Sequence, residues 1–190
     1  MSAVARSVAV PIGAACAGAW RDKPYRETLT LHDGWHVNLR PIHRSDASAL
    51  RDFFFGSLSP RTRLMRFHGV VNVLPDDVLR ALATQQPHRR VALVALTTTD
   101  DGVPRLLAEA RYVVDDAGEA EFALAVGDAW QGQGLGRALV QRLAAHARAE
   151  GLAMLVGTVM PGNEPMLHLM QVLGAEVRSD ASEVQVRLPL

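Results

Sequence analysis

Three glycines stand at alternate positions in the segment 130–137 (WQGQGLGR), directly after an apolar, strand-like run and directly before an amphipathic helical pattern. A glycine inside a helix costs about 1 kcal/mol relative to alanine, so three of them where a helix begins need a physical reason. The first turn of a helix has unpaired N–H groups and a partial positive charge. Bare glycine backbone at that point is typical of a site for a phosphate group.

The spacing of these glycines distinguishes between phosphate-binding motifs. A dinucleotide fingerprint, G-x-G-x-x-G, would need a glycine where the chain has Arg137, and the chain contains no P-loop string G-x-x-x-x-G-K-[ST]. What remains is Gln131-x-x-Gly134-x-Gly136. This string resembles the Q/R-x-x-G-x-G/A signature of the GCN5-related N-acetyltransferases (GNATs), which hold the pyrophosphate of acetyl-CoA. The alternative is a helix entry whose glycines serve tight packing alone.

Composition predicts a soluble globular protein with one domain. Of 190 residues, 48% are hydrophobic and 21% are charged. Lys+Arg and Asp+Glu number 20 each, which argues against a nucleic-acid partner bound through a broad basic face. The single cysteine, Cys16, excludes a disulfide framework and favours a cytoplasmic location. The histidines show no metal-ligand spacing, so we expect no metal site.

We assign residues 1–27 to an N-terminal extension and residues 28–190 to a single catalytic domain. The apolar segment 8–19 has some likeness to a secretory signal, but it contains Pro11 and two glycines, and the basic region before it is thin. It is also too short to span a bilayer as a helix. We therefore expect no membrane partner.

The hydrophobic pattern predicts a strand region, helices, three strands, a helix, a strand, a helix and a strand. The expected strands are 28–31, 35–41, 91–98, 105–114, 119–126, 154–159 and 183–188, and the expected helices are 45–55, one from Pro60, 75–83, 135–150 and 163–173. This order is similar to that of the GNAT fold, an α+β fold with a mixed, mostly antiparallel sheet and helices on both faces. The resemblance covers roughly residues 30–190.

Four segments resemble the bacterial protein-lysine acetyltransferase (Pat-like) branch of that family. They are VNLRPIHRSDASAL (37–50), SLSPRTRLMRF (57–67), AEFALAV (120–126) and MPGNEPM (160–166). The second is the most telling, because a generic acetyltransferase needs no such string. The resemblance implies acetyl transfer from acetyl-CoA to a protein lysine, with a protein substrate such as an acyl-CoA synthetase. A small-molecule amine acceptor and a catalytically silent acyl-CoA sensor are the alternatives, and a homodimer is compatible with the chain.

The resemblance also implies which residues hold acetyl-CoA. In the family, the strand before the glycine loop splays from the next strand, and the pantetheine arm pairs with its backbone. By position, the contacts come from Leu124, Ala125, Val126, Gln131, Gly132, Gln133, Gly134, Leu135, Gly136 and Arg137. Asn163, at the start of the last helix, either caps that helix or contacts the CoA arm.

Glu121 is the predicted general base. It matches the glutamate in the A-E-F-A string of the Pat-like branch, and a carboxylate beside an apolar strand can have a raised pKa. Glu119, on the same strand face, and Glu109, in the neighbouring strand, are alternative bases. For each of the three, the other interpretation is a solvated strand carboxylate.

Two further features concern the acceptor and the leaving group. Many family members carry a tyrosine on the last helix that protonates the leaving thiolate, but Met170 stands at that position. The proton then comes from water or another residue, or none is needed. Arg61, Arg63 and Arg66 fall where the family borders its acceptor site, so they either meet an acidic substrate surface or form a solvated helix face.

Overall fold

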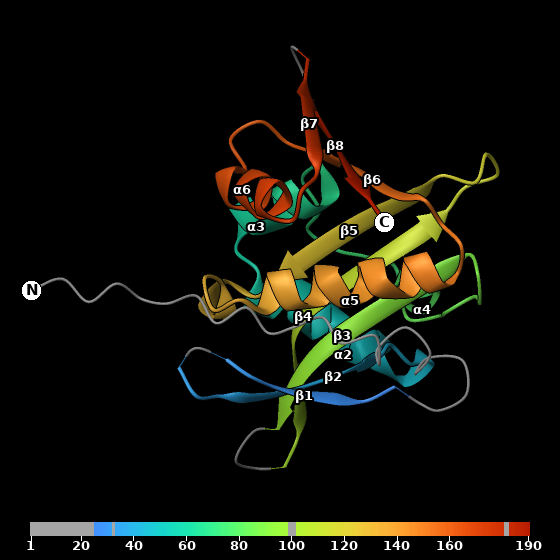
Figure 1. The fold of residues 1–190 in the computed structure, drawn as a ribbon. Helices are drawn as coiled ribbons and strands as arrows, with labels where there is room; N and C mark the ends of the chain where they lie inside the picture. The colour runs from blue at the N-terminus through green and yellow to red at the C-terminus, as the bar shows by residue number, and fades with distance from the viewer. Residues whose placement is uncertain (1–24, 32, 99–101, 181–182) are drawn as a thin grey trace, which may run out of the picture.

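A computed structural model of the chain describes residues 25–31, 33–98, 102–180 and 183–190. Their strands form one sheet of eight in the order β1-β2-β3-β4-β5-β6-β8-β7 (Figure 1). The strands are β1 (Glu27–Thr30), β2 (His36–Pro41), β3 (Arg90–Thr98), β4 (Pro104–Val114), β5 (Ala120–Val126), β6 (Met154–Val159), β7 (Glu176–Ser179) and β8 (Val184–Pro189). Most of the predicted extension, including Cys16 and the apolar segment 8–19, lies outside the described residues.

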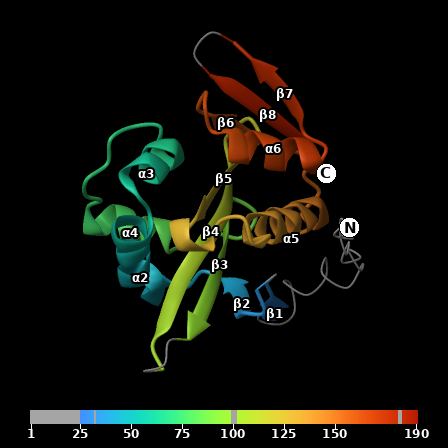
Figure 2. The same cartoon turned by 90° about the vertical axis from the view of Figure 1, so that its left-hand side faces the viewer.

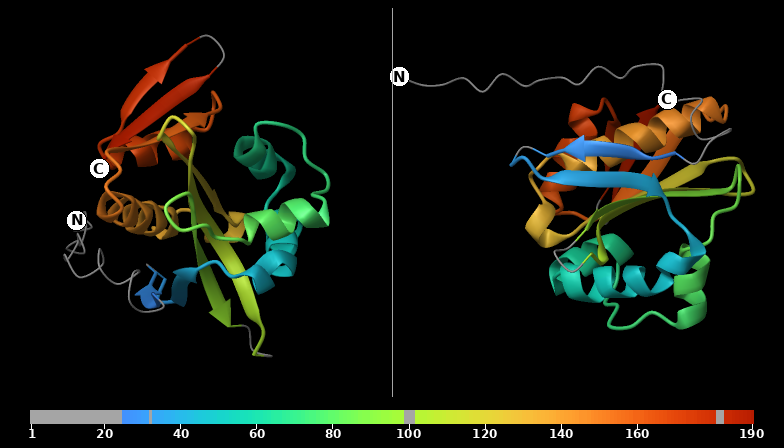
Figure 3. Two further views of the ribbon diagram at one scale, coloured as in Figure 1. Left: turned by 90° about the vertical axis from the view of Figure 1, so that its right-hand side faces the viewer. Right: turned by 90° about the horizontal axis from the view of Figure 1, so that it is seen from below.

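Helices cover both faces of this sheet, as predicted (Figures 2 and 3). They are η2 (Arg44–Asp46), α2 (Ala47–Asp52), η3 (Phe53–Ser57), α3 (Pro60–Phe67), α4 (Asp76–Leu82), η4 (Asp128–Trp130), α5 (Leu135–Ala149) and α6 (Glu164–Val172). Helices α5 and α6 lie on one face, and α2, α3 and α4 lie on the other. In the described part of the chain, no helix is both long and apolar enough to cross a membrane.

Each face of the sheet has its own core. On the α5 face, Leu139 and Leu143 are fully buried with Tyr112 of β4. On the opposite face, Leu50 and Phe54 pack with the strand residues that point that way. Because side chains alternate along a strand, β5 serves both cores: Phe122 belongs to the first and Ala125 to the second.

The sheet opens between β5 and β6. These two strands are parallel, and their register includes only Ala120 with Leu155 and Glu121 with Val156. Beyond Glu121, β5 pairs with β4 alone, while β6 continues beside β8. The separation of β5 from β6 is the feature that positions the site.

The structure corrects two sequence expectations. The helix predicted over 45–55, for which Ser45 is the N-cap suggested by the sequence, begins earlier: His43 caps the short helix η2, and Asp46 occupies the N-cap position of α2. The Asp46 carboxylate instead accepts hydrogen bonds from Arg40 and from the backbone of His43, so it fixes the entry from β2. The last strand region is also a hairpin, β7 and β8, where a single strand was expected.

Candidate active site

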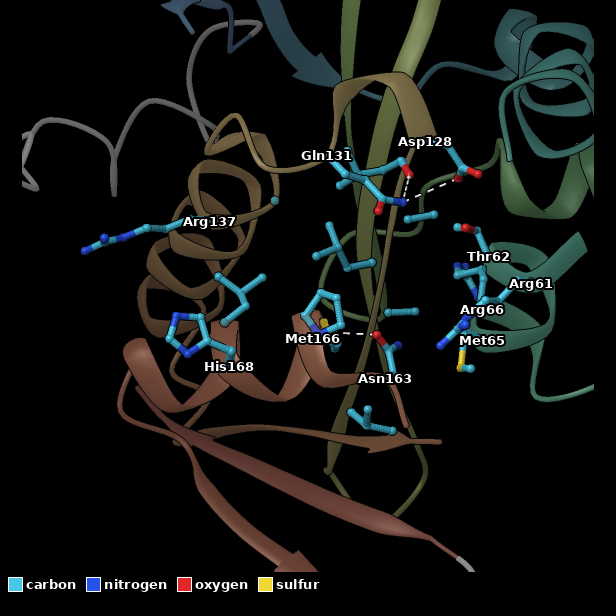
Figure 4. Close-up of a pocket in the computed structure, with 18 of the residues that line it drawn as sticks. Arg61, Thr62, Met65, Arg66, Asp128, Gln131, Arg137, Asn163, Met166 and His168 are labelled. Carbon is cyan, nitrogen blue, oxygen red and sulfur yellow. Dashed lines mark hydrogen bonds between the residues drawn. The ribbon is translucent and has the colours of Figure 1, made fainter. Parts of the chain in front are cut away.

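A cavity of about 1090 Å³ lies where β5 and β6 separate. Its wall contains residues of α3, β5, the loop 127–134, β6 and α6 (Figure 4). Since α3 lies on one face of the sheet and α6 on the other, the cavity passes beside β5 from face to face. It therefore offers two approaches to the same strand.

The glycine loop at one end of the cavity leaves backbone N–H groups bare. Gly132 and Gly134 have φ values of +74° and +86°, the left-handed region that glycine adopts without strain. Gly134 is the N-cap of α5, and no side chain caps the helix there. The first intrahelical hydrogen bond of this turn runs from Ala138 N to Gly134 O at 3.0 Å, so the amides of residues 132–137 are available to an anion.

Gly136, in the first turn of α5, allows the helix to lie close to β5. A Cβ at this position would be 3.3 Å from Leu124 Cδ2 and 3.5 Å from Val126 Cγ2. Both neighbours belong to the part of β5 that pairs with β4 but no longer with β6. The bare helix start and the free strand edge are thus adjacent, which suits a ligand with an anionic group joined to an extended arm.

The edge of β5 that faces the opening has no partner strand among the described residues. Leu124 and Val126 are in register with Ala110 and Ala108 of β4, and the pairing with β6 has already ended at Glu121. Backbone N–H and C=O groups on such an edge can bind an extended ligand as an added strand would.

The three carboxylates considered as bases, one in β4, one in β5 and one just before β5, have different surroundings. Glu121 is exposed and lines the cavity, at the point where the pairing of β5 with β6 ends. Glu119 is exposed outside the cavity, 3.6 Å from Arg187. Glu109 is fully buried and accepts hydrogen bonds from Arg66 and Arg111. Of the three, Glu121 is the one in contact with the cavity.

The pKa of Glu109 is lowered, although its burial acts in the opposite direction. Burial favours the neutral acid, but the charges of Arg111 and Arg66 and the hydrogen bonds they donate outweigh it. The carboxylate therefore stays ionised inside a cluster of two guanidinium groups. A base that takes up a proton near neutral pH is favoured by the opposite shift, so the lowered pKa argues against Glu109 as the base, and its hydrogen bonds to Arg66 and Arg111 give the cluster a structural role.

Sequence similarity identifies the family. Residues 64–175 match the Acetyltransferase (GNAT) family. The chain belongs to this family. Acetyltransferase PA5475 of Pseudomonas aeruginosa is 32% identical over 146 residues, which cover 76% of this chain and 77% of that relative.

Solved GNAT structures share the fold. The GNAT domain of S. lividans PAT is 27% identical with a TM-score of 0.77, and the match covers 87% of this chain and 97% of that domain. The Salmonella typhimurium acetyltransferase yncA, solved with its cofactor acetyl-CoA, is 20% identical with a TM-score of 0.61, over 81% of this chain and 92% of that chain. The predicted GNAT fold and the enzyme class, an acetyl-CoA-dependent acetyltransferase, are confirmed.

Most of the residues predicted to hold acetyl-CoA in this GNAT acetyltransferase lie together. The cavity wall includes Leu124, Ala125, Val126, Gln131, Gly132, Gly134, Gly136, Arg137 and Asn163. Gln133 and Leu135 are absent from it, and the Leu135 side chain is fully buried in the α5 core. Any contact of these two residues with the cavity would come from their backbone.

Two of these side chains have roles within the protein. Gln131 Nε2 donates to Val126 O at 3.1 Å, so it ties the glycine loop to the end of β5 (Figure 4). Asn163 Oδ1 accepts from Met166 N at 3.4 Å, which confirms the capping role at the start of α6. Its contact with the CoA arm stays a prediction. The sequence motif identified Gln131 but gave no signal for this internal hydrogen bond.

Several residues of the segment 57–67 make contacts that hold α3 in place. Ser59 caps α3 through Thr62 N at 3.3 Å, and its own N–H donates to Asp128 Oδ2 at 3.1 Å, next to the glycine loop. Arg63 Nη1 donates to Leu58 O at 2.7 Å. The Arg66 guanidinium lies 5.0 Å from the centre of the Phe67 ring. The string therefore positions α3 against both the sheet and the loop.

Helix α6 supplies cavity residues that sequence analysis missed. Met170, at the position of the family's tyrosine, is fully buried in the core and is not part of the cavity wall. Met166 and His168 line the cavity instead, together with Thr158 of β6. Among the described residues, no group of three or more His, Cys, Asp or Glu side chains is placed to hold a metal ion.

Proposed function

We propose that this GNAT acetyltransferase acts as a Pat-like enzyme that transfers an acetyl group to protein lysines, with Glu121 as its general base. The supporting observation is the α3 segment 57–67, whose residues Thr62, Met65 and Arg66 line the end of the cavity that lies across β5 from α5 and α6. The likeness to the GNAT domain of S. lividans PAT also supports it. A protein substrate such as an acyl-CoA synthetase and a cytoplasmic location belong to the same proposal.

The residues present fit acetyl-CoA. The uncapped start of α5, with Gly134 and Gly136, would hold the pyrophosphate, and the free edge of β5 at 124–126 would pair with the pantetheine arm. Asn163 lies beside that edge in the cavity wall. When bound, acetyl-CoA supplies an activated acetyl thioester.

Glu121 would remove a proton from the incoming ammonium group, directly or through water. Strand alternation places it on the α3 face of β5, the same face as Ala125, which packs in the α3-side core. It is exposed, so solvent can carry the proton away. Met170 cannot protonate the leaving thiolate, and a CoA thiolate is a fair leaving group, so water suffices for that step.

The test is release of free CoA from acetyl-CoA by the purified protein, with a panel of acceptors that includes acyl-CoA synthetases. Glu121→Gln should lose turnover and keep acetyl-CoA binding. Glu119→Gln is the matched control, because Glu119 is an exposed carboxylate just before β5 but outside the cavity. Binding without turnover in the unaltered protein would instead indicate an acyl-CoA sensor.

The acceptor class requires its own comparison. Acetyl-lysine levels across the proteome, measured in the wild type and in a deletion strain, should fall at specific lysines when the gene is deleted. Unchanged lysine acetylation together with turnover on an amino acid or another small amine would refute the protein-lysine assignment.

A further inference from the structure

One face of α3 forms the wall of the cavity on the side away from α5 and α6. Arg61, Thr62, Met65 and Arg66 all line the cavity, and their spacing of one, four and five residues places them on the same side of a helix (Figure 4). The segment 57–75 contains no aspartate or glutamate. This end of the cavity is therefore bordered by a basic element with no carboxylate of its own.

The three arginines of α3 differ in what they contact. Arg63 binds the Leu58 carbonyl and lies 5.6 Å from the centre of the Phe55 ring. Arg66 is held by the buried Glu109 carboxylate. Arg61 is exposed, lines the cavity, and forms no ion pair or hydrogen bond within the described ranges. Two of the guanidinium groups thus stabilise the fold, and the Arg61 guanidinium is available to a ligand.

The other charged groups at this end complete the pattern. Glu121 of β5 lines the cavity, and no cationic side chain of the described residues pairs with it. The other carboxylate in the cavity wall, that of Asp128, accepts hydrogen bonds from Ser59 N and from Gln131 Nε2. His68, at the end of α3, is exposed and lines the cavity. A ligand that complements this end carries a cation toward Glu121 and an anion toward Arg61.

We propose that the acceptor carries a carboxylate near its reactive amine and that Arg61 binds this carboxylate. The proposal rests on the acetyl-CoA cavity and on the Glu121 base of the proposed function, and it applies to either class of acceptor, because it assigns the second group of the acceptor at the same site. The carboxylate has two possible sources: an acidic residue beside the modified lysine, or the α-carboxylate of a free amino acid acetylated on its α-amine. Charge complementarity of this kind sets specificity more than it sets total affinity.

Bisubstrate conjugates test the proposal without requiring turnover. In each one, the CoA sulfur is joined through an acetyl linker to an amine. Two are pentapeptides joined at a central lysine, flanked either by glutamates or by lysines. Two more are alanine joined at its α-amine, with a free carboxylate or with an amide. Dissociation constants are measured by calorimetry for the unaltered protein, for Arg61→Glu and for Arg80→Glu, an exposed arginine of α4 outside the cavity.

For the unaltered protein and for Arg80→Glu, we expect the carboxylate-bearing member of one pair to bind roughly threefold to fivefold more tightly, since an attraction replaces a repulsion or a neutral contact at an exposed side chain. Arg61→Glu should abolish or reverse this preference while the dissociation constant of CoA itself stays the same. The pair that shows the preference identifies the source of the carboxylate.

Two results overturn the inference: no preference in either pair, or a preference that Arg61→Glu leaves unchanged. Failure of the proposed function is a different result. If CoA itself does not bind, the acetyltransferase assignment of the cavity is wrong, whereas CoA binding without a carboxylate preference refutes the role of Arg61 alone.

Discussion

Glu109→Gln should destabilise the protein strongly, because glutamine cannot replace the charge that Glu109 places between two arginines. Glu109 is fully buried, and its two oxygens accept from Arg66 Nη2 at 2.7 Å and from Arg111 Nε at 2.8 Å. Glutamine has nearly the same shape, but it is uncharged and its NH₂ group would face a guanidinium donor. The substitution leaves two buried cations without their anion.

The expected loss is about 3 kcal/mol in the free energy of unfolding. Removing one partner of a buried ion pair typically costs roughly 3–5 kcal/mol. The lower end applies here, because the side chains of both arginines keep 11% of their surface exposed and can recover some hydration. For a chain of this length, about 3 kcal/mol corresponds to a fall in Tm of roughly 6–12 °C.

Urea unfolding followed by circular dichroism measures this loss. Glu119→Gln is the control: its carboxylate lies 3.6 Å from Arg187 at the surface, and an exposed pair of this kind contributes at most about 1 kcal/mol. A Glu109→Gln protein as stable as the Glu119→Gln protein would refute the ion-paired cluster. Unchanged stability with abolished turnover would restore Glu109 as a candidate base.

Three further perturbations follow from the backbone and from the surface charges. Gly134→Val should weaken acetyl-CoA binding at least about tenfold, as measured by calorimetry. A β-branched residue is strained at φ +86° and would displace the start of α5. An unchanged dissociation constant would contradict this expectation. Gly157→Ala should lower the free energy of unfolding in urea by roughly 1–3 kcal/mol, since its Cβ would lie 2.8 Å from the Phe122 ring. An unchanged free energy of unfolding would show that the ring can move away. A hydrogen bond from Arg142 holds the pKa of Glu27 below its ordinary value. The pair therefore stabilises the fold fully above the unfolded-state pKa of about 4.3, and this contribution is lost as the pH falls through the lower folded-state pKa. Unfolding curves from pH 7 to pH 3 should therefore show a smaller acid loss for Glu27→Gln than for the unaltered protein, and equal losses would contradict the pair's role.

The order of strands and helices was largely predictable because most elements have a clear period and a clear end. The amphipathic stripe of α5 runs to a glycine, Gly151, with φ +83°, and α6 is followed by Gly174 with φ +88°. Strand β7 was not predictable: its four residues, EVRS, are mostly exposed, so the sequence shows no apolar alternation there. An edge strand that buries little leaves little trace in the hydrophobic pattern.

The site was predictable in its backbone and less so in its side chains. The glycine spacing located the bare start of α5, and alternation along the predicted strand 119–126 put Glu121 and Glu119 on one face. What surrounds each carboxylate depends on elements that are distant in the sequence: Arg66 of α3 reaches Glu109, and Arg187 of β8 lies near Glu119. For this reason Glu109 and Glu119 were indistinguishable as alternative bases before the structure, whereas Glu109 is enclosed by arginines and Glu119 lies at the surface.

The opening of the sheet beside β5 has a kinetic consequence. Because residues on the α6 side and on the α3 side of the sheet both line this cavity, we expect the acetyl donor and the amine to enter from opposite faces and to be bound at the same time. The acetyl group can then pass directly to the amine, without a covalent acetyl-enzyme intermediate. Initial rates measured at several concentrations of both substrates should give intersecting double-reciprocal lines rather than the parallel lines of a ping-pong reaction.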